Sequence, residues 1–129
     1  MTMTEDDLIA LVKTYFAGVD GEDYAGIRKT LSDRCLFTVE THGVHLQGDG
    51  EIRQMFDNLW SSHAAVLHRD FVFTAAPSDN RIAVRFAVVN THHDGSETHK
   101  SNANFFEVMD GRFSRVSVYM AGENTLNTA

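Results

Sequence analysis

FFEVMDGRFSRVSVYM, residues 105–120, is the stretch that decides the fold class of this chain. It joins two apolar segments through Asp110-Gly111, and such a turn between two strand-like segments is a strong signal for a β-hairpin. The same pattern extends towards the amino terminus, where turn signals at 77–80 and 94–95 separate further apolar segments. The predicted strands are 66–75, 81–92, 98–109 and 112–120. Short connections between them predict an antiparallel meander.

The first half of the chain has the periodicity of helices. Thr4 is a predicted N-cap, and apolar residues then recur at spacings of three and four up to Val19. Shorter periodic patterns predict two more helices, at 23–31 and at about 51–62. Between them, alternating residues predict a strand at about 35–40 and its hairpin partner at 44–47. Helices followed by an antiparallel sheet predict a single α+β domain over residues 1–129.

Composition and charge exclude several classes of protein. The 129 residues are 43% hydrophobic and 22% charged with a net charge of −7, which is typical of a globular domain and opposite to a nucleic-acid-binding surface. No apolar run approaches the roughly 20 residues that span a bilayer, and the acidic amino terminus is unlike a signal peptide. We therefore expect a cytoplasmic protein with no nucleic-acid or membrane partner. The single cysteine, Cys35, cannot form an internal disulfide.

Four segments carry a resemblance to a known superfamily. They are Tyr15-Phe16-Ala17, GEDYAGIRKTLSDRCLF at 21–37, LQGDGEIRQMF at 46–56, and FFEVMDGRFSRVSVYM at 105–120. With the order of elements, they resemble the nuclear transport factor 2-like superfamily, which includes ketosteroid isomerase, scytalone dehydratase and the SnoaL-like polyketide cyclases. The resemblance implies a cone-shaped, cystatin-like α+β fold, in which three N-terminal helices pack over the concave face of a curved antiparallel sheet.

The resemblance also implies positions for catalytic groups. In ketosteroid isomerase-like enzymes, a tyrosine on the first helix and an acid on a long strand bind the developing enolate, while a carboxylate on the first strand moves the proton. Tyr15 matches the tyrosine, and Glu40 lies at or beside the carboxylate position. Asn104 stands where those enzymes have the strand acid. An amide is a weaker hydrogen-bond donor than a protonated carboxyl group, so this position departs from the steroid isomerase pattern.

Strand alternation predicts the neighbours of Glu40. If Glu40 points inward, His42 shares its face, because side chains two residues apart lie on the same side of a strand. Either residue is a candidate general base: desolvation raises the pKa of a carboxyl group, and histidine ordinarily titrates near neutral pH. Tyr15 and Asn104 are candidate donors to a substrate oxygen. The alternative is structural: a core tyrosine, an exposed carboxylate and an amide that satisfies backbone groups.

The other candidate site residues form a mostly apolar lining. Small-molecule sites are typically apolar clefts with a few convergent polar groups, and a concave sheet covered by helices provides such a cleft. The candidate ligand-binding residues are Phe16, Trp60, Phe86, Asn102, Val116, Val118 and Met120. We expect the ligand to be a small apolar molecule.

The sequence contains seven histidines and only one proline. The segment THHDGSETH, residues 91–99, contains enough ligand types for a metal ion, but it lacks the tight spacing of zinc motifs such as HExxH. We expect solvated turn histidines there, with neither a metal nor another cofactor. His63 and His68 lie near the end of the third predicted helix and in the following strand, where either is a secondary candidate for lining the mouth of the cone.

Two functions remain open from the sequence. The first is a cofactor-independent enzyme of the isomerase, cyclase or dehydratase type that transfers protons on a small apolar carbonyl compound. The second is a non-catalytic ligand-binding or dimerisation module of the same fold. For both, Phe105, Met109 and Tyr119 on the outer face of the sheet predict a homodimer through that face.

Overall fold

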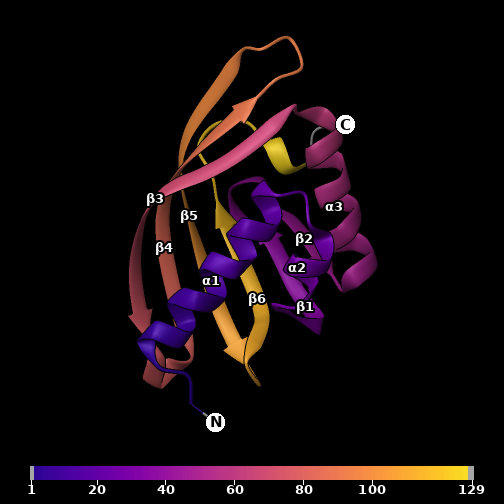
Figure 1. Ribbon diagram of the computed structural model, residues 1–129. Helices are drawn as coiled ribbons and strands as arrows, with labels where there is room; N and C mark the ends of the chain where they lie inside the picture. Colours follow the sequence, from indigo (N-terminus) through magenta and orange to yellow (C-terminus); the bar gives the residue numbers. More distant parts are fainter. Residues whose placement is uncertain (1, 128–129) are drawn as a thin grey trace.

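The computed structural model describes residues 2–127 and shows an α+β architecture (Figure 1). Its elements follow one another in the order α1–α2–β1–η1–β2–α3–β3–η2–β4–β5–β6–η3, where η denotes a short 3-10 helix. The strands form one curved sheet covered by helices, so the predicted fold class is confirmed. Within residues 2–127, no helix combines the length and the apolar character needed to cross a membrane.

The helices begin at or near the residues that the sequence predicts. α1 spans Glu5–Asp20, and Thr4 and Asp7 form a reciprocal capping box at its start. α2 is a short helix, Tyr24–Arg28, that ends earlier than predicted. α3 spans Asp49–Ser62 and begins two residues earlier than predicted. The local cap and spacing signals therefore located all three helices.

One six-stranded sheet with the strand order β2-β1-β6-β5-β4-β3 carries the fold. Its strands are β1 (Leu31–Val39), β2 (Val44–Gln47), β3 (Ala65–Ala76), β4 (Arg81–Thr91), β5 (Glu97–Met109) and β6 (Arg112–Tyr119). β3 to β6 form the predicted antiparallel meander, and β1 and β2 form the predicted hairpin. β1 also pairs in parallel with β6. Turn signals do not predict this pairing, because no short connection joins the two strands.

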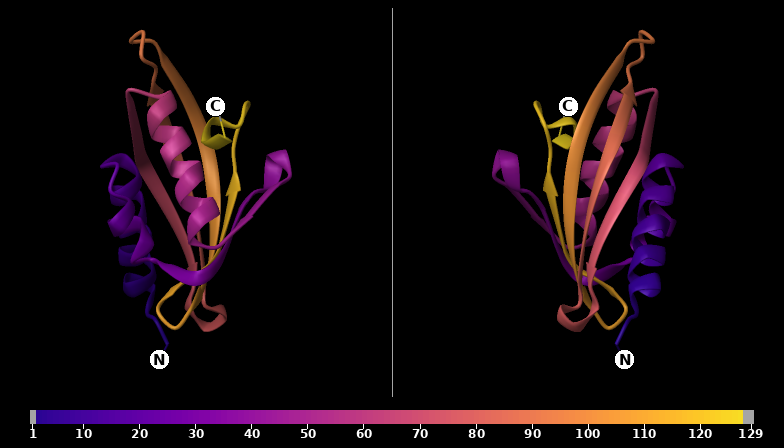
Figure 2. Two further views of the ribbon diagram at one scale, coloured as in Figure 1. Left: turned by 90° about the vertical axis from the view of Figure 1, so that its right-hand side faces the viewer. Right: turned by 90° about the vertical axis from the view of Figure 1, so that its left-hand side faces the viewer.

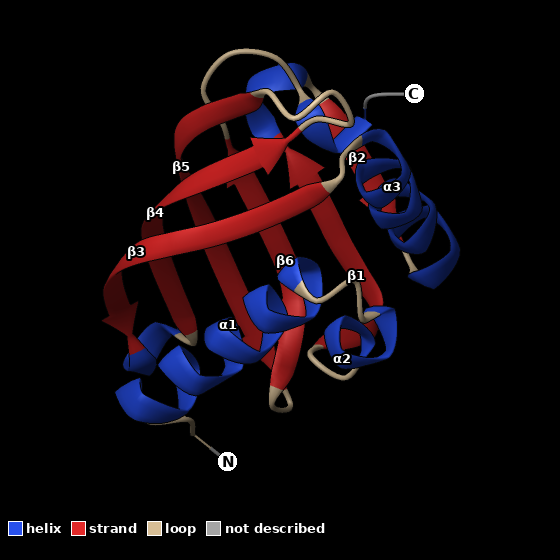
Figure 3. Cartoon of the chain, turned by 45° about the horizontal axis from the view of Figure 1, so that its top comes forward, coloured by secondary structure: helices blue, strands red, loops and turns tan. Residues whose placement is uncertain are grey.

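The sheet narrows at one end and opens at the other. Its strands converge near the N-terminus and spread apart towards the end where the C-terminus lies (Figure 2). Asp70 contributes to the bending of β3: its φ is 59°, and the register with β4 shifts there. Such bulges increase local twist and bend a strand. α1 crosses the strands and packs mainly on β3, whereas α3 lies beside β1 and β2 (Figure 3).

The concave side of the sheet carries the core. Along β5, alternate residues from Lys100 to Val108 are buried, as expected when one face of a strand is covered. Phe106 on β5 and Phe37 and Cys35 on β1 are among the buried core residues. Burial raises the pKa of the Cys35 thiol to about 12, so the thiol stays protonated at neutral pH. Cys35 therefore serves as a small apolar core residue.

Candidate functional site

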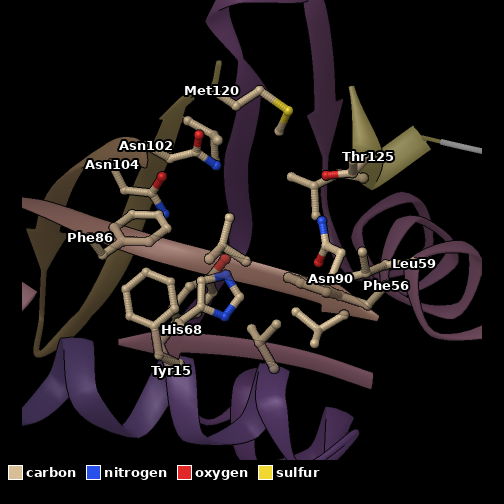
Figure 4. A pocket seen from close by; sticks show the side chains of 16 residues that line it. Tyr15, Phe56, Leu59, His68, Phe86, Asn90, Asn102, Asn104, Met120 and Thr125 are labelled. Atoms are coloured by element: carbon tan, nitrogen blue, oxygen red, sulfur yellow. The ribbon is translucent and has the colours of Figure 1, made fainter. Parts of the chain in front are cut away.

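A cavity of about 30 Å³ lies between the concave face of the sheet and helices α1 and α3 (Figure 4). The 3-10 helix η3, Thr125–Asn127, contributes Thr125 and Leu126 to its wall. Most lining side chains are apolar. The polar ones are Tyr15, His68, Asn90, Asn102, Asn104 and Thr125. This composition is typical of a small-molecule site.

His68 and Asp20 form a hydrogen-bonded pair at the wall of this cavity. Asp20 is the last residue of α1, and His68 lies on β3. One carboxylate oxygen of Asp20 lies 2.5 Å from Nδ1 of His68, and the other accepts the backbone N–H of His68 at 2.8 Å. Because an ionised carboxylate only accepts hydrogen bonds, Nδ1 carries the proton. Nε2 is therefore the acceptor that the neutral ring offers to a ligand.

Aromatic contacts fix the ring of His68. Its centroid lies 4.8 Å from that of Phe16 and 5.3 Å from that of Phe86. The side chains of His68 and Asp20 are 11% and 21% exposed, so both are largely removed from water. A ring held by two neighbours and by its own Nδ1 is already oriented before a ligand arrives.

Tyr15 lies deep in the same cavity and is 2% exposed. Its ring packs edge-on against Phe106 and Phe113, at centroid distances of 5.6 and 6.1 Å. Burial raises the pKa of its hydroxyl well above the ordinary value, with further contributions from Cys35 and Asp20. The hydroxyl is therefore protonated at neutral pH and available as a hydrogen-bond donor.

Three asparagines contribute amide groups. Asn102 and Asn104 are neighbours on the inward face of β5, and Asn90 projects from β4 (Figure 4). Oδ1 of Asn102 accepts the backbone N–H of Ala121 at 3.0 Å. Within residues 2–127, Oδ1 of Asn104 and both polar side-chain atoms of Asn90 are buried without a hydrogen-bond partner. Unpaired buried polar groups cost free energy, so a ligand or water that paired with them here would be stabilised.

His42 and Glu40 lie outside this cavity. β1 ends at Val39, and Glu40–His42 forms the 3-10 helix η1, in which side chains do not alternate with a period of two. The prediction that strand alternation places both side chains on one inward face is therefore wrong. His42 is exposed, and its Nδ1 lies 3.0 Å from the hydroxyl of Thr41.

Glu40 is paired with a cation instead of being desolvated in an apolar pocket. It accepts a hydrogen bond from Nη2 of Arg115 at 3.2 Å. The hydroxyl of Thr38 and the guanidinium of Arg115 hold the pKa of Glu40 below its usual range. A carboxyl base that works near neutral pH needs a raised pKa, so these surroundings oppose the role expected for Glu40.

Five of the seven expected ligand-binding residues line the cavity: Phe16, Phe86, Asn102, Val118 and Met120. Trp60 has a different place, because its indole N–H donates to the backbone carbonyl of Val19 at 2.9 Å and its ring stacks on Phe56. It thereby joins α3 to α1. Val116 is fully buried in the core, opposite Phe106 on the neighbouring strand.

Asp20 and Asn90 are polar groups that sequence reasoning did not place in the site, and it named His68 only as a residue near the mouth of the cone. Asp20 directly follows the helical pattern that ends at Val19, and 48 residues separate it from His68. No local pattern connects the two positions. A signal did exist for Asn90: it continues the alternating inward series Ile82, Val84, Phe86 and Val88, all of which are buried.

The turn between β4 and β5 brings its histidines to separate local partners. Nε2 of His92 lies 2.6 Å from the hydroxyl of Thr98, and Nε2 of His93 lies 2.8 Å from the carbonyl of Ser61. His99 pairs with Glu97 at 3.0 Å. In the part of the chain that the structure describes, no three His, Cys, Asp or Glu side chains are arranged to hold a metal ion.

Comparisons with known proteins identify the fold. No protein-family model matches the sequence, and the curated proteins give no match. Solved structures do match. A proposed polyketide cyclase from Xanthomonas campestris pv. campestris is 20% identical over 88% of this chain and 90% of its own, with a TM-score of 0.82.

Two further solved structures extend this similarity. An NTF2-like protein of unknown function from Exiguobacterium sp. 255-15 is 15% identical over 88% of this chain and 99% of its own, with a TM-score of 0.75. A proposed isomerase from Bacillus subtilis is 14% identical over 92% of this chain and 90% of its own, with a TM-score of 0.80. The chain therefore has the nuclear transport factor 2-like fold that its sequence motifs predict.

Proposed function

We propose that this chain, with its nuclear transport factor 2-like fold, is an enzyme that transfers protons on a small apolar carbonyl compound, as isomerases, cyclases and dehydratases do. The observation that carries the proposal is the His68–Asp20 pair, 2.5 Å apart at the wall of a mostly apolar cavity. A base oriented by a carboxylate and within reach of a ligand is what general base catalysis requires. The neighbours described as a cyclase and an isomerase support this reaction class without indicating a substrate.

In the proposed reaction, Nε2 of His68 removes a proton from the carbon next to the substrate carbonyl. The C–H electron pair forms a C=C bond, and the carbonyl π pair moves to oxygen, which gives an enolate and an imidazolium ion. Asp20 stabilises that imidazolium through Nδ1. If the substrate also has a C=C bond next to the deprotonated carbon, the product is a dienolate, and return of the proton to its far carbon shifts that double bond and completes an isomerisation. In a cyclisation, the enolate carbon attacks a second carbonyl, and the imidazolium protonates the resulting alkoxide.

Tyr15 and Asn104 are the proposed donors to the enolate oxygen. Tyr15 suits this role because burial keeps its hydroxyl protonated. Asn104 suits it because its amide lies in the cavity and its Nδ2 is a hydrogen-bond donor, whereas its unpaired Oδ1 can only accept. Donors already oriented in a water-poor site stabilise charge as it develops.

Substrate entry requires movement of the segment 121–127. The cavity of about 30 Å³ is too small for a carbonyl compound of several carbons, and Thr125 and Leu126 of this segment form part of its wall. The segment is held by the hydrogen bond from the Ala121 N–H to Asn102 and by the ammonium of Lys100, which donates to the carbonyl of Glu123. We propose that these contacts open when substrate enters, as lids do in other enzymes.

The His68→Gln variant tests the proposal. Wild type and variant are incubated in D2O with a panel of small cyclic and aromatic ketones, and exchange of the hydrogens next to the carbonyl is followed by NMR. This assay detects proton removal without knowledge of the natural substrate. We expect His68→Gln to lower the exchange rate by roughly 10²–10⁴-fold. The surface variant His42→Gln is the matched control and should keep the wild-type rate.

Thermal unfolding of all three proteins shows whether a loss of rate reflects a loss of fold. Equal exchange rates in the wild type and a folded His68→Gln variant would contradict the assignment of His68 as the base. If both exchange rates also equal the rate without protein while the ketones still bind, the result would favour the non-catalytic ligand-binding module instead.

The outer face of the sheet favours dimerisation, whichever of the two functions holds. Phe105, Met109 and Tyr119 are 53%, 64% and 42% exposed, and the rings of Phe105 and Tyr119 contact each other at a centroid distance of 5.5 Å. Covering such a patch with a second copy removes apolar area from water. We propose a homodimer through this face.

Analytical ultracentrifugation of the Phe105→Ser variant tests the dimer. The wild type should sediment as a dimer at micromolar concentration, and the variant should shift towards monomer. Leu67→Ser is the control, because Leu67 is 47% exposed but lies on the edge strand β3. A monomeric wild type, or equal effects of the two substitutions, would contradict dimerisation through the Phe105 face.

A further inference from the structure

A second cavity, of about 360 Å³, lies beside the first one. Its walls come from the end of α3, from the facing ends of β4 and β5, and from the segment that follows β6. Thr125 lines both cavities, so the C-terminal segment forms part of the wall of each. A volume of this size is within the range of small-molecule sites.

Basic and protonatable side chains are concentrated around this second cavity. His63, His92, His99 and Lys100 line it, although the whole chain carries a net charge of −7. Glu123 is the one acid among the residues that the structure places on this wall. The rings of His63 and His92 pack with their centroids 5.4 Å apart.

Lys100 is a buried cation whose ammonium bonds to a backbone carbonyl. It is 9% exposed, and its ammonium donates a hydrogen bond to the backbone carbonyl of Glu123. The negative charge of Glu123 opposes the effect of burial on the pKa of Lys100 without outweighing it. Removing an ammonium from water without an opposite charge is expensive, and burial accordingly lowers the pKa of Lys100. Its remaining N–H groups are available to an anionic oxygen.

The two packed histidines each have one ring nitrogen left for a ligand. Nδ1 of His63 donates to the backbone carbonyl of Leu59 at 2.8 Å, which leaves Nε2. Nε2 of His92 is paired with the hydroxyl of Thr98, which leaves Nδ1. His63 is 4% exposed, so its free nitrogen depends on the cavity for a partner.

The nearby acids belong to other contacts. Glu97 pairs with His99. Asp94 accepts hydrogen bonds from the backbone N–H and the hydroxyl of Ser96. These bonds lower the pKa of Asp94, and His92 makes a smaller contribution in the same direction. Glu123 lines the cavity, and its charge acts on the pKa of Lys100 against the effect of burial. Its charge opposes a doubly charged anion more strongly than a singly charged one, which favours a carboxylate over a phosphate dianion.

We propose that the second cavity binds the carboxylate group of a small cyclic or aromatic acid. Lys100 and Nδ1 of His92, in the tautomer that carries its proton there, donate to the carboxylate, and the apolar part of the ligand lies towards Thr125 and the first cavity. The carboxylate site stands on its own geometry. Only the orientation of the apolar part rests on the proposed function of the first cavity.

Benzoate and benzamide are suitable probes, because they share a ring and differ in charge. Their affinities for the full chain are measured by titration calorimetry and by the movement of backbone amide signals in NMR spectra. We expect benzoate to bind at least tenfold more tightly than benzamide. We also expect benzoate to shift the amide signals of Lys100 and Gly122 more than that of the distant Lys29. Gly122 is close to the ammonium group, because a Cβ atom at this position would lie 3.8 Å from Nζ of Lys100. Equal affinities, or benzoate shifts centred elsewhere, would overturn the proposal.

Substitutions then assign the charge preference to named groups. Lys100→Met keeps a side chain of similar length and should lower benzoate affinity at least tenfold while leaving benzamide affinity unchanged. Lys29→Met, at an exposed lysine, is the matched control and should have no effect. Glu123→Gln should strengthen benzoate binding, because it removes the opposing charge. A benzoate preference that survives in a folded Lys100→Met variant would overturn the proposal.

The His68→Gln variant separates this proposal from the proposed function. It should lose proton exchange on ketones and retain the preference for benzoate over benzamide. Loss of the carboxylate preference in Lys100→Met, together with its retention in His68→Gln, would support the second cavity. Should His68→Gln abolish the benzoate preference as well, benzoate binds in the first cavity, and the assignment of the second one is overturned.

Discussion

Two acid–base pairs in this molecule are built from similar parts and differ in their surroundings. Asp20 and His68 lie 2.5 Å apart at the cavity wall, and Glu40 and Arg115 lie 3.2 Å apart outside it. The two acids are similarly exposed, at 21% and 25%, but the imidazole is 11% exposed and the guanidinium 38%. Exposure of the acid alone therefore does not distinguish them.

The base decides which pair is suited to proton transfer. An imidazole gains and loses a proton near neutral pH, whereas a guanidinium remains charged. His68 also lines the cavity, and neither Glu40 nor Arg115 does. The Asp20–His68 pair, called the inner pair below, therefore has an exchangeable proton next to a ligand site. The Glu40–Arg115 pair, called the outer pair, is an electrostatic link between η1 and β6.

After removal of His68 itself, Asp20→Asn is expected to lower the rate of ketone hydrogen exchange more than any other substitution in the two pairs. An amide of the same shape cannot stabilise the imidazolium as a carboxylate does, so we expect a fall in ketone exchange of roughly 10²-fold or more. Glu40→Gln makes the same chemical change in the outer pair and should alter the rate less than about twofold. NMR exchange assays of the two variants check this, and equal rates would refute the distinction between the pairs.

Tyr15→Phe is expected to have the next largest effect. It removes the proposed donor to the enolate oxygen and keeps the ring that packs on Phe106. We expect the exchange rate to fall roughly 10- to 100-fold with little change in thermal midpoint. Tyr24→Phe is the matched control, because the hydroxyl of Tyr24 bonds to Asp49 away from the cavity. A similar rate for both variants would remove Tyr15 from the proposed mechanism.

Arg115→Met breaks the outer pair and should have only a small effect on stability. A partly exposed ion pair contributes on the order of 0.5 kcal/mol, so urea unfolding should show a destabilisation of that size. Ketone exchange should remain at the wild-type rate. A loss of exchange would show that the Glu40–Arg115 pair matters to the reaction and would reopen the role that the sequence suggested for Glu40.

The smallest expected effect is a pH dependence of stability from the outer pair. Thr38 and Arg115 hold the pKa of Glu40 below its ordinary value of 4.5 in the folded state. The resulting stabilisation is fully present above the unfolded-state pKa and is lost as pH falls through the folded-state pKa. Between about pH 5 and about pH 3, the wild type should lose more unfolding free energy than Glu40→Gln. Equal losses in urea titrations would contradict this link.

Most of the fold was predictable because its signals are local. The capping box at Thr4, the helical spacing up to Val19 and the Asp110-Gly111 turn each act within a few residues, and each element lies where its signal places it. The parallel pairing of β1 with β6 was not predictable in this way. It depends on the closure of the cone, which joins strands that are distant in the chain.

The candidate site was less predictable because its chemistry depends on tertiary contacts. Tyr15 and Asn104 lie in the cavity, where the motifs and strand alternation place them. Glu40 does not, because alternation stops when β1 ends at Val39. Asp20 reaches His68 only because α1 packs against β3, and no spacing rule connects a helix end to a strand 48 residues later.

The parallel contact between β1 and β6 has a consequence for the order in which the chain folds. Phe37 lies opposite Val116, so the first strand gains its place in the sheet only when the last strand is present. Until then β1 and β2 form an isolated hairpin, which is marginally stable in water. The hairpin therefore joins the sheet only after β6 has left the ribosome, in a late step that closes a loop of most of the chain. A nascent chain that stalls before β6 leaves the meander incomplete and the hairpin without a neighbour.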